Sequence, residues 1–391
     1  MKKSVLLILI LGVLICFSAC GGSGETGNSG SLVSSDYVYV PEYFPLPSNE
    51  MDNVDNISYY DGKLYFSSYG VVGTREPSAE ELEWTEGVVE EWMTELYGTA
   101  FYSVNLDGSE FTRLEGFEPS PLPEGMMGDT SVNSFTLDHE GNFWILENQY
   151  VYTYDEDGAW LDGGESFFLR KLDSNGTEIG FIDLEPVVSK QEWFYANGLS
   201  VDKQGFIYVC SENTVFVMDP STGSLAFEVM LEGDGWINTI VALSNGKVGA
   251  SLYDANGNYL IKEIDVESKA FGKEYKLPPT SYELYSGGGE YLVYCSDANY
   301  LYGVKADSGE SVALLNWIDS DINTNDMRNV IPLEDGRIIC FNQTYSYDED
   351  GNYTGSQEVV ALTKTPAADV PEKKILTLAT MWLDYNIRSA V

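Results

Sequence analysis

Residues 197–211 read NGLSVDKQGFIYVCS, and this short stretch contains the unit from which most of the chain is built. Apolar and polar residues alternate on both sides of a turn that contains Gly205. Alternation with a period of two around a glycine turn predicts a β-hairpin. The same pattern recurs along the chain at 56–68, 133–147, 238–252, 282–296 and 329–343.

The spacing of these hairpins indicates a repeat architecture. Their turn glycines are Gly62, Gly141, Gly205, Gly246, Gly289 and Gly336, and the last three steps are 41, 43 and 47 residues. The first five hairpins are each followed by a second one, at 101–114, 167–182, 214–229, 259–275 and 300–315. Four strands in about 40–50 residues are typical of a β-propeller blade. We therefore expect an all-β fold with six blades, and a seventh only if the first long insertion contains one.

The repeat resembles NHL-like β-propellers, most clearly at NGLSVDKQGFIYV (197–209), over roughly residues 50–365. Such a resemblance implies a fold and does not specify a function. The sixth unit has only one further strand after its hairpin, at 357–365. We expect residues 36–44 (DYVYVPEYF) to supply the missing outer strand, so that the propeller occupies residues 36–365 and both of its ends are held in one blade.

The insertion in the first blade predicts a helix. In residues 79–97, Leu82, Val89, Trp92, Met93 and Leu96 fall at helical spacing, and glutamates occupy the other face. We expect one amphipathic helix that packs as a flank or lid on the propeller; a docking site for a partner helix is the alternative.

The N-terminus has the pattern of an export signal. Lys2 and Lys3 precede an apolar run, Val5 to Phe17, that is too short to span a bilayer. The sequence Phe17-Ser18-Ala19-Cys20 resembles a bacterial lipobox. The resemblance implies a signal peptide at 1–19, a lipid on Cys20 and a Gly/Ser tether at 20–35. It predicts an extracytoplasmic protein anchored to the outer face of the bacterial cell membrane; an ordinary secreted protein is the alternative.

The C-terminus begins a different pattern. Residues 366–374 form a predicted linker, and 375–391 start with the apolar run ILTLATMW. This segment resembles the opening of an extracellular solute-binding domain, as in lipoproteins that feed sugar importers. The resemblance implies a carbohydrate-uptake role, an ABC-transporter permease as a partner, and a chain that is the N-terminal part of a longer protein.

Composition limits the possible functions. The chain has 62 acidic and 21 basic residues, for a net charge of −41, which excludes general nucleic-acid binding. Its single histidine, His139, leaves little room for histidine-based catalysis or zinc ligation. We expect no cofactor, although the acidic turns at 155–158 and 348–351 could hold adventitious calcium. Cys210, Cys295 and Cys340 occupy similar strand positions and are expected to be small buried hydrophobes.

A recurring asparagine provides the candidate site. Asparagine begins five of the inner strands, and a tryptophan precedes two of these asparagines. The residues are Asn56, Asn133, Asn197, Asn238 and Asn329, with Trp193 and Trp236. Amides beside aromatic rings at the mouth of the central channel would suit a sugar or another polar small molecule. The alternative is that each asparagine only fixes the turn into its strand.

Three functions are compatible with these features. The first is a non-enzymatic binding module for a ligand or partner on a surface lipoprotein that precedes a solute-binding domain. The second is a propeller enzyme of the lactonase or lyase type with a metal at the channel mouth. The third is a standalone envelope scaffold. Three or four carboxylates at the mouth would favour the enzyme, and aromatic side chains there would favour binding.

Overall fold

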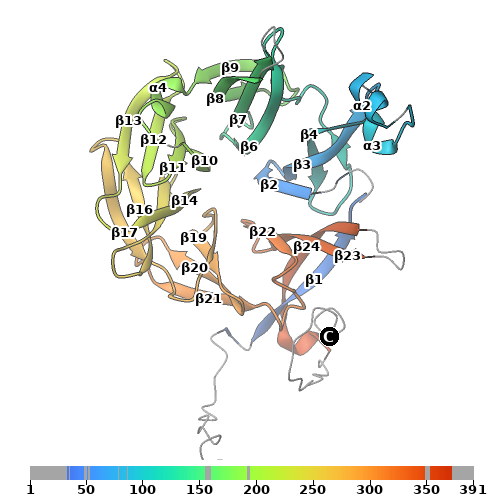
Figure 1. The fold of residues 1–391 in the computed structure, drawn as a ribbon. Coiled ribbons are helices and arrows are strands. Elements are labelled where there is room, and N and C mark those ends of the chain that lie inside the picture. Colours follow the sequence, from blue (N-terminus) through green and yellow to red (C-terminus); the bar gives the residue numbers. More distant parts are fainter. Residues whose placement is uncertain are drawn as a thin grey trace, which may run out of the picture.

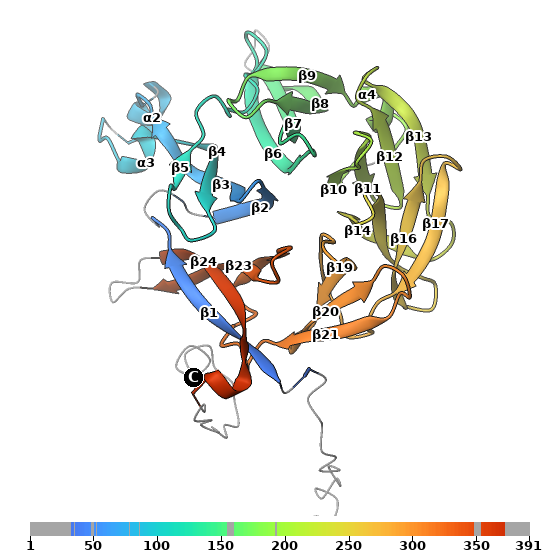
Figure 2. The same cartoon turned by 180° about the vertical axis from the view of Figure 1, so that it is seen from behind.

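The protein was analysed as a computed structural model that describes residues 33–34, 36–47, 51, 53–77, 79–85, 87–154, 160–191, 194–347 and 353–371. Its strands form six four-stranded antiparallel sheets, which are arranged as blades around a central axis (Figure 1, Figure 2). The six-bladed β-propeller predicted from the repeat is therefore confirmed, and the described residues contain no seventh blade.

Each blade is numbered in chain order, and its strands are given from the channel outwards. Blade 1 contains β2 (Asn53–Tyr60), β3 (Lys63–Thr74), β4 (Glu95–Asn105) and β5 (Thr112–Arg113). Blade 2 contains β6 (Met127–Leu137), β7 (Phe143–Tyr154), β8 (Trp160–Leu172) and β9 (Glu178–Asp183). Blade 3 contains β10 (Ala196–Val201), β11 (Ile207–Ser211), β12 (Thr214–Asp219) and β13 (Ser224–Met230).

The remaining blades follow the same plan. Blade 4 contains β14 (Trp236–Ala242), β15 (Val248–Tyr253), β16 (Tyr259–Asp265) and β17 (Ala270–Lys276). Blade 5 contains β18 (Glu283–Tyr285), β19 (Tyr291–Ser296), β20 (Tyr300–Lys305) and β21 (Ser311–Asn316). Blade 6 contains β22 (Met327–Pro332), β23 (Ile338–Tyr347), β24 (Tyr353–Pro366) and β1 (Tyr37–Pro45). A short helix, α4 (Glu185–Val188), follows blade 2, and a 3₁₀ turn, η2 (Ala367–Asp369), follows β24.

The N-terminal strand closes the ring. β1 pairs antiparallel with β24 along its whole length, from Tyr37 opposite Pro366 to Pro45 opposite Glu358. Figure 1 shows β1 beside β24 at the outside of blade 6. The prediction that residues 36–44 supply the missing outer strand is confirmed. Because a propeller blade needs an outer strand to protect its edge, this pairing joins the two ends of the repeat.

The insertion of blade 1 differs from the single helix expected over 79–97. It contains two short helices, α2 (Ala79–Trp84) and α3 (Glu91–Thr94), and β4 begins at Glu95. Gly87 has φ 84° and its N–H donates to the Leu82 carbonyl, which ends α2 in a turn. Val88 and Val89 after this turn are exposed, whereas Met93 is fully buried. The helical pattern is therefore interrupted, and only part of its apolar face packs on the propeller.

The core lies between the blades. Six clusters of buried apolar side chains occur, and each contains residues from two neighbouring blades, including blades 6 and 1. One four-stranded sheet cannot bury both of its faces, so each blade depends on the blades on either side of it.

Aspartates of the hairpin turns account for part of the acidic composition. Asp202 accepts hydrogen bonds from the backbone N–H groups of Gln204 (2.8 Å) and Phe206 (3.0 Å), and from the Tyr208 hydroxyl (2.8 Å). An aspartate oxygen accepts from the N–H two residues later in seven further hairpin turns of the described residues, at Asp107, Asp138, Asp173, Asp219, Asp254, Asp297 and Asp335. Such turns use a short carboxylate to satisfy backbone donors.

The three cysteines of the repeat are buried and form no disulfide, as predicted. Cys210, Cys295 and Cys340 lie in the second strands of blades 3, 5 and 6 and are fully buried. No helix in the described ranges has the length and apolarity needed to cross a membrane.

Candidate functional site at the channel mouth

The inner strands of the six blades line a central channel with two different ends. At the loop end, the chain enters each inner strand from the preceding blade. At the turn end, each inner strand turns back at its glycine. The predicted asparagines all lie towards the loop end, in or beside the inner strands β2, β6, β10, β14 and β22.

The recurrence of asparagine in the inner strands has a local structural cause. In four inner strands, a β-bulge leaves one residue without a partner, and that residue is asparagine: Asn56, Asn133, Asn197 and Asn238. In blade 6 the bulged residue is Arg328, and Asn329 pairs with Phe341. Asparagine suits a bulge because it tolerates unusual backbone angles, and Asn56 has φ 47°.

Asn56 and Asn329 line the channel. They contribute to a cavity of about 460 Å³ at the loop end. The Asn329 side-chain amide donates to the Ile57 carbonyl (3.0 Å), and its oxygen accepts from the Val330 N–H (2.8 Å). Asn329 therefore joins blade 6 to blade 1 in addition to lining the cavity.

Asn197 and Asn238 have a different environment. The Asn197 side-chain amide donates to the carbonyls of Ile237 (3.3 Å) and Asn238 (3.2 Å), which fastens blade 3 to blade 4. A side chain at Gly198 would come within 2.8 Å of Ile240, so glycine permits this close approach. Neither asparagine lines the cavity. Their contacts fit the alternative in which asparagine serves the repeat.

The other predicted site residues are separate from this cavity or outside the described ranges. Asn133 is exposed at its bulge in β6 and does not line the cavity. Trp193 and Cys20 lie outside the residues that the structure describes, as do the two acidic turns considered for calcium. Within the described ranges, no group of three His, Cys, Asp or Glu side chains could hold a metal ion.

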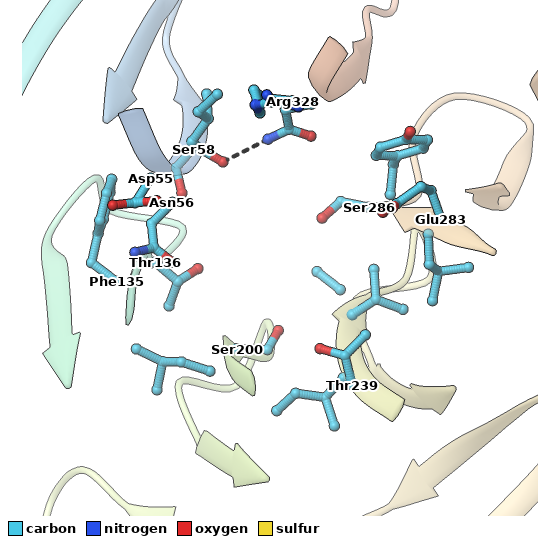
Figure 3. Close-up of a pocket in the computed structure, with 18 of the residues that line it drawn as sticks. Asp55, Asn56, Ser58, Phe135, Thr136, Ser200, Thr239, Glu283, Ser286 and Arg328 are labelled. Carbon is cyan, nitrogen blue, oxygen red and sulfur yellow. Dashed lines mark hydrogen bonds between the residues drawn. The ribbon is translucent and has the colours of Figure 1, made fainter. Parts of the chain in front are cut away.

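Three charged residues that the asparagine search missed also line the cavity. Asp55 comes from blade 1, Glu283 from blade 5 and Arg328 from blade 6. In Figure 3, Asp55 and Glu283 lie on opposite sides of the opening. Hydroxyl side chains line the wall between them, at Ser58, Thr136, Ser200, Thr239 and Ser286 (Figure 3). The cavity is therefore rich in oxygen atoms.

Sequence spacing contained a signal for two of these residues. Arg328 lies eight residues before its turn glycine, as do Asn133, Asn197 and Asn238. Glu283 lies six residues before Gly289, as Asn56 does before Gly62. A search by position rather than by residue type would have found both.

Both carboxylates of the cavity belong to exposed residues, but neighbouring protein atoms remove part of their contact with water. This desolvation disfavours the charged form of Asp55 and raises the pKa of that side chain. Burial raises the pKa of Glu283 in the same way. Because both residues are exposed, solvent screens much of this effect on each charge.

Aromatic side chains lie at the loop end of three consecutive blades. Trp236 begins β14, two residues before Asn238, and 51% of it is exposed. Its ring stacks on Tyr253 (centroids 4.7 Å apart), and Tyr253 stacks on Tyr259 (4.7 Å). Tyr195 and Tyr282 lie at the starts of the inner strands of blades 3 and 5, and they are 73% and 48% exposed. The stack fixes the Trp236 ring while leaving much of it open to solvent.

The turn end of the channel is lined by basic side chains and glycines. A second cavity of about 480 Å³ there is lined by His139, Lys203 and Lys247, together with Gly287–Gly289. Lys247 is already paired with Glu263 (3.0 Å) and Asp265 (3.4 Å). The loop end, with its carboxylates, hydroxyls and exposed rings, is the stronger candidate for a binding site.

Comparisons with known proteins do not identify a function. No protein-family model and no curated protein matches the chain. Similar solved structures include a chain of a mitotic checkpoint complex (10% identity, TM-score 0.42, covering 83% of this chain and 94% of that one). They also include a protein of unknown function from Dyadobacter fermentans (11%, 0.42, 85% and 96%) and one from Bacteroides caccae (14%, 0.36, 63% and 79%). These TM-scores are below 0.5, so the six-bladed fold rests on the chain's own sheet topology.

Proposed function

We propose that the propeller is a non-enzymatic binding module that holds a polar ligand of carbohydrate type at the loop end of its channel. The observation that carries the proposal is the exposed, stacked ring of Trp236, at the same end of the channel as the oxygen-rich cavity. Sugars present apolar ring faces and hydroxyl edges, so they bind to aromatic platforms that have polar groups nearby. The volume of about 460 Å³ lies in the usual range for small-molecule sites.

The enzyme alternative has less support. Two carboxylates line the described part of the mouth, fewer than the three or four that would favour a metal-dependent propeller enzyme. The neighbouring hydroxyls and rings suit recognition, and binding is therefore the function that we propose.

We further propose that this module belongs to a surface lipoprotein of a carbohydrate-uptake system. The support comes from the sequence: the lipobox-like Phe17-Ser18-Ala19-Cys20, the Gly/Ser tether and the solute-binding-like pattern after residue 374. A lipid on Cys20 would hold the propeller at the outer face of the membrane, and an ABC-transporter permease would be the partner. Metabolic labelling with palmitate tests the anchor, since Cys20→Ala should abolish incorporation.

A thermal-shift screen of neutral oligosaccharides tests the binding function. We expect at least one sugar to raise the melting temperature, because a ligand that binds only the folded state stabilises it. Trp236→Ala should remove this shift. Trp84→Ala is the matched control, because Trp84 is 82% exposed but lies on α2, at the periphery of blade 1 (Figure 1). Equal losses in both variants, or no shift with any sugar, would count against the proposal.

A further inference from the structure

One turn of blade 3 supports exposed aromatic residues of two blades. Ser211 ends β11, and Asn213 lies in the turn that connects β11 to β12. The fully buried Ser211 hydroxyl accepts from the Tyr195 N–H (3.0 Å) and donates to the Gln191 side-chain oxygen (2.9 Å). Tyr195 is thereby held at its backbone, within its own blade.

Asn213 holds the backbone on both sides of Trp236, in the next blade. Its Oδ1 accepts from the Ile237 N–H (3.1 Å), and its Nδ2 donates to the Gly235 carbonyl (3.1 Å). A Cβ atom at Gly235 would come within 2.5 Å of the Tyr253 carbonyl, so glycine lets the chain pass close to β15 before it reaches Trp236. Because its ring also stacks on Tyr253, Trp236 is fixed at both its backbone and its side chain.

Tyr195 and Trp236 occupy the same position in neighbouring repeats. Each lies ten residues before the turn glycine of its blade, and both are more than half exposed. Ser211 and Asn213, which hold the backbone around them, are two residues apart, and two residues of chain span at most about 7 Å. The spacing of these two aromatic surfaces is therefore set by one short turn.

The boundary between blades 3 and 4, which are neighbours in the ring (Figure 1, Figure 2), is also fastened at the channel. In addition to the bonds that the Asn197 amide donates across it, the Thr239 hydroxyl donates back to the Asn197 carbonyl (3.0 Å). A recognition surface that is already rigid loses less conformational entropy when a ligand binds. The two aromatic surfaces are therefore preorganised.

Exposed polar side chains flank the two rings. Glu212 lies in the supporting turn, Asp234 precedes Trp236 by two residues, and Asn238 follows it by two. Their oxygen atoms can accept hydrogen bonds from sugar hydroxyls. The net charge of −41 repels an anionic glycan, so a neutral one fits this surface best.

We propose that the ligand of the loop-end site is a neutral linear oligosaccharide, which crosses the boundary between blades 3 and 4 and stacks on both Tyr195 and Trp236. This inference rests on the proposed binding function and adds the chain length of the ligand. Once one sugar unit is stacked, a linked unit meets the second ring at a high effective concentration. A monosaccharide lacks this gain. Asn213 is a positioning residue of the site, because it acts on Trp236 and not on the sugar.

Isothermal titration calorimetry of the full chain tests the chain length. The probes are gluco-, manno- and xylo-oligosaccharides, each series running from the monosaccharide to the hexasaccharide. In at least one series we expect the affinity to rise at least tenfold between the monosaccharide and the longest oligomer, because the second ring adds its contact.

Matched variants assign this rise to the second ring. Tyr195→Ala should weaken binding of the oligomer about tenfold and leave the affinity for the monosaccharide unchanged, because Trp236 still presents one stacking surface. Tyr69→Ala is the control, because Tyr69 is 52% exposed but belongs to β3 of blade 1, and it should change neither affinity.

A further pair of variants tests the support of Trp236. Asn213 and Asn299 lie in corresponding turns of blades 3 and 5, and their carbonyls accept from the N–H groups of Leu231 (2.8 Å) and Trp317 (2.9 Å). The Asn299 side chain is exposed, so Asn299→Ala is the control. Asn213→Ala should weaken sugar binding about tenfold and diminish the near-ultraviolet circular dichroism signal that Trp236→Ala removes, whereas Asn299→Ala should change neither.

The possible results separate the inference from the function on which it rests. If a monosaccharide binds as tightly as its oligomers, or if the gain with chain length persists in Tyr195→Ala, the oligosaccharide inference fails and the binding function stands. If Asn213→Ala and Asn299→Ala behave alike, Asn213 is not a positioning residue. If no sugar binds and the oligosaccharide screen is negative, both proposals fail.

Discussion

At the scale of single residues, a buried ion pair in blade 2 provides a sharp test of the structure. Glu147 is fully buried, and its Oε1 lies 2.8 Å from Arg170 Nη1. Arg170 also contacts Glu178 (2.8 Å) and donates to the Glu118 carbonyl (2.9 Å), while Glu147 accepts from the Ser120 N–H (3.3 Å). The pair thereby fastens the proline-rich loop after residue 117 to the blade.

Removing the charge of Glu147, the buried partner of Arg170, should lower the stability of the fold. Glu147→Gln leaves the Arg170 charge in a mostly buried position, and we expect the free energy of unfolding to fall by about 3 kcal/mol in urea titrations. Glu178→Gln is the control, because the Glu178 side chain is 47% exposed and should contribute less than about 1 kcal/mol. Equal effects of the two changes would contradict the arrangement.

The buried cysteines lead to a second test at this scale. Burial raises the pKa of Cys210, Cys295 and Cys340 to about 12, so their thiolates are scarce at neutral pH. In a variant with Cys16 and Cys20 replaced by serine, iodoacetamide at pH 8 should leave the folded protein unlabelled. The same reagent in 8 M urea should label three sites by mass spectrometry. Rapid labelling of the folded protein would show that the second strands are more accessible than the structure indicates.

At the scale of secondary-structure elements, β1 should determine whether the ring holds together. Tyr39 of β1 is buried in the core between blades 5 and 6, beside Trp317 and Leu362. Tyr39→Ala should lower the free energy of unfolding by about 3–4 kcal/mol, the usual cost of removing a buried aromatic side chain. The neighbouring change Val40→Thr affects an exposed position and should cost well under 1 kcal/mol. Similar losses for the two variants would mean that β1 does not close the ring.

Elements defined by local sequence were the ones that could be predicted. The six glycine turns and their alternating strands are local signals, and a count of strands per blade was enough to assign 36–44 to blade 6. The insertion could not be predicted in the same way. Its apolar spacing is helical, but the chain after Thr94 pairs with β3, from Glu95 opposite Thr74 to Tyr97 opposite Val71. Non-local pairing of this kind overrides local periodicity.

The candidate site shows the same limit. Four of the asparagines mark a real structural feature, the bulge of the inner strands. Whether a residue lines the cavity, however, depends on its position in the inner strand and not on its type. Asp55, Glu283 and Arg328 share that position or lie next to it, although their side chains have no type in common. A repeat search finds what the blades have in common, whereas a binding site depends on what differs between them.

At the scale of the whole molecule, two groups of acids respond oppositely to pH. Hydrogen bonds from neighbouring side-chain and backbone groups hold the pKa below its usual range for Asp107, Asp173, Asp219, Asp254, Asp265, Asp307 and Asp335. Burial raises the pKa of Asp55, Glu283, Asp326 and Glu358. The first group stabilises the fold when charged, and the second destabilises it when charged.

The melting temperature should therefore pass through a maximum at mildly acidic pH. As the pH falls from neutral towards the range in which carboxyl groups titrate, the acids with raised pKa take up protons more readily in the folded state, and the magnitude of the net charge of −41 decreases, so stability rises. Below about 4, the usual pKa of aspartate in unfolded chains, the turn aspartates bind protons more readily when unfolded, and stability is lost as the pH falls through their folded pKa values. Calorimetry at constant ionic strength measures this profile. The double variant Asp55→Asn, Glu283→Gln should show a smaller increase in melting temperature between neutral and mildly acidic pH. Its loss of stability below about pH 4 should be unchanged. A melting temperature that falls continuously from neutral pH downwards would contradict the role given to the carboxylates with raised pKa.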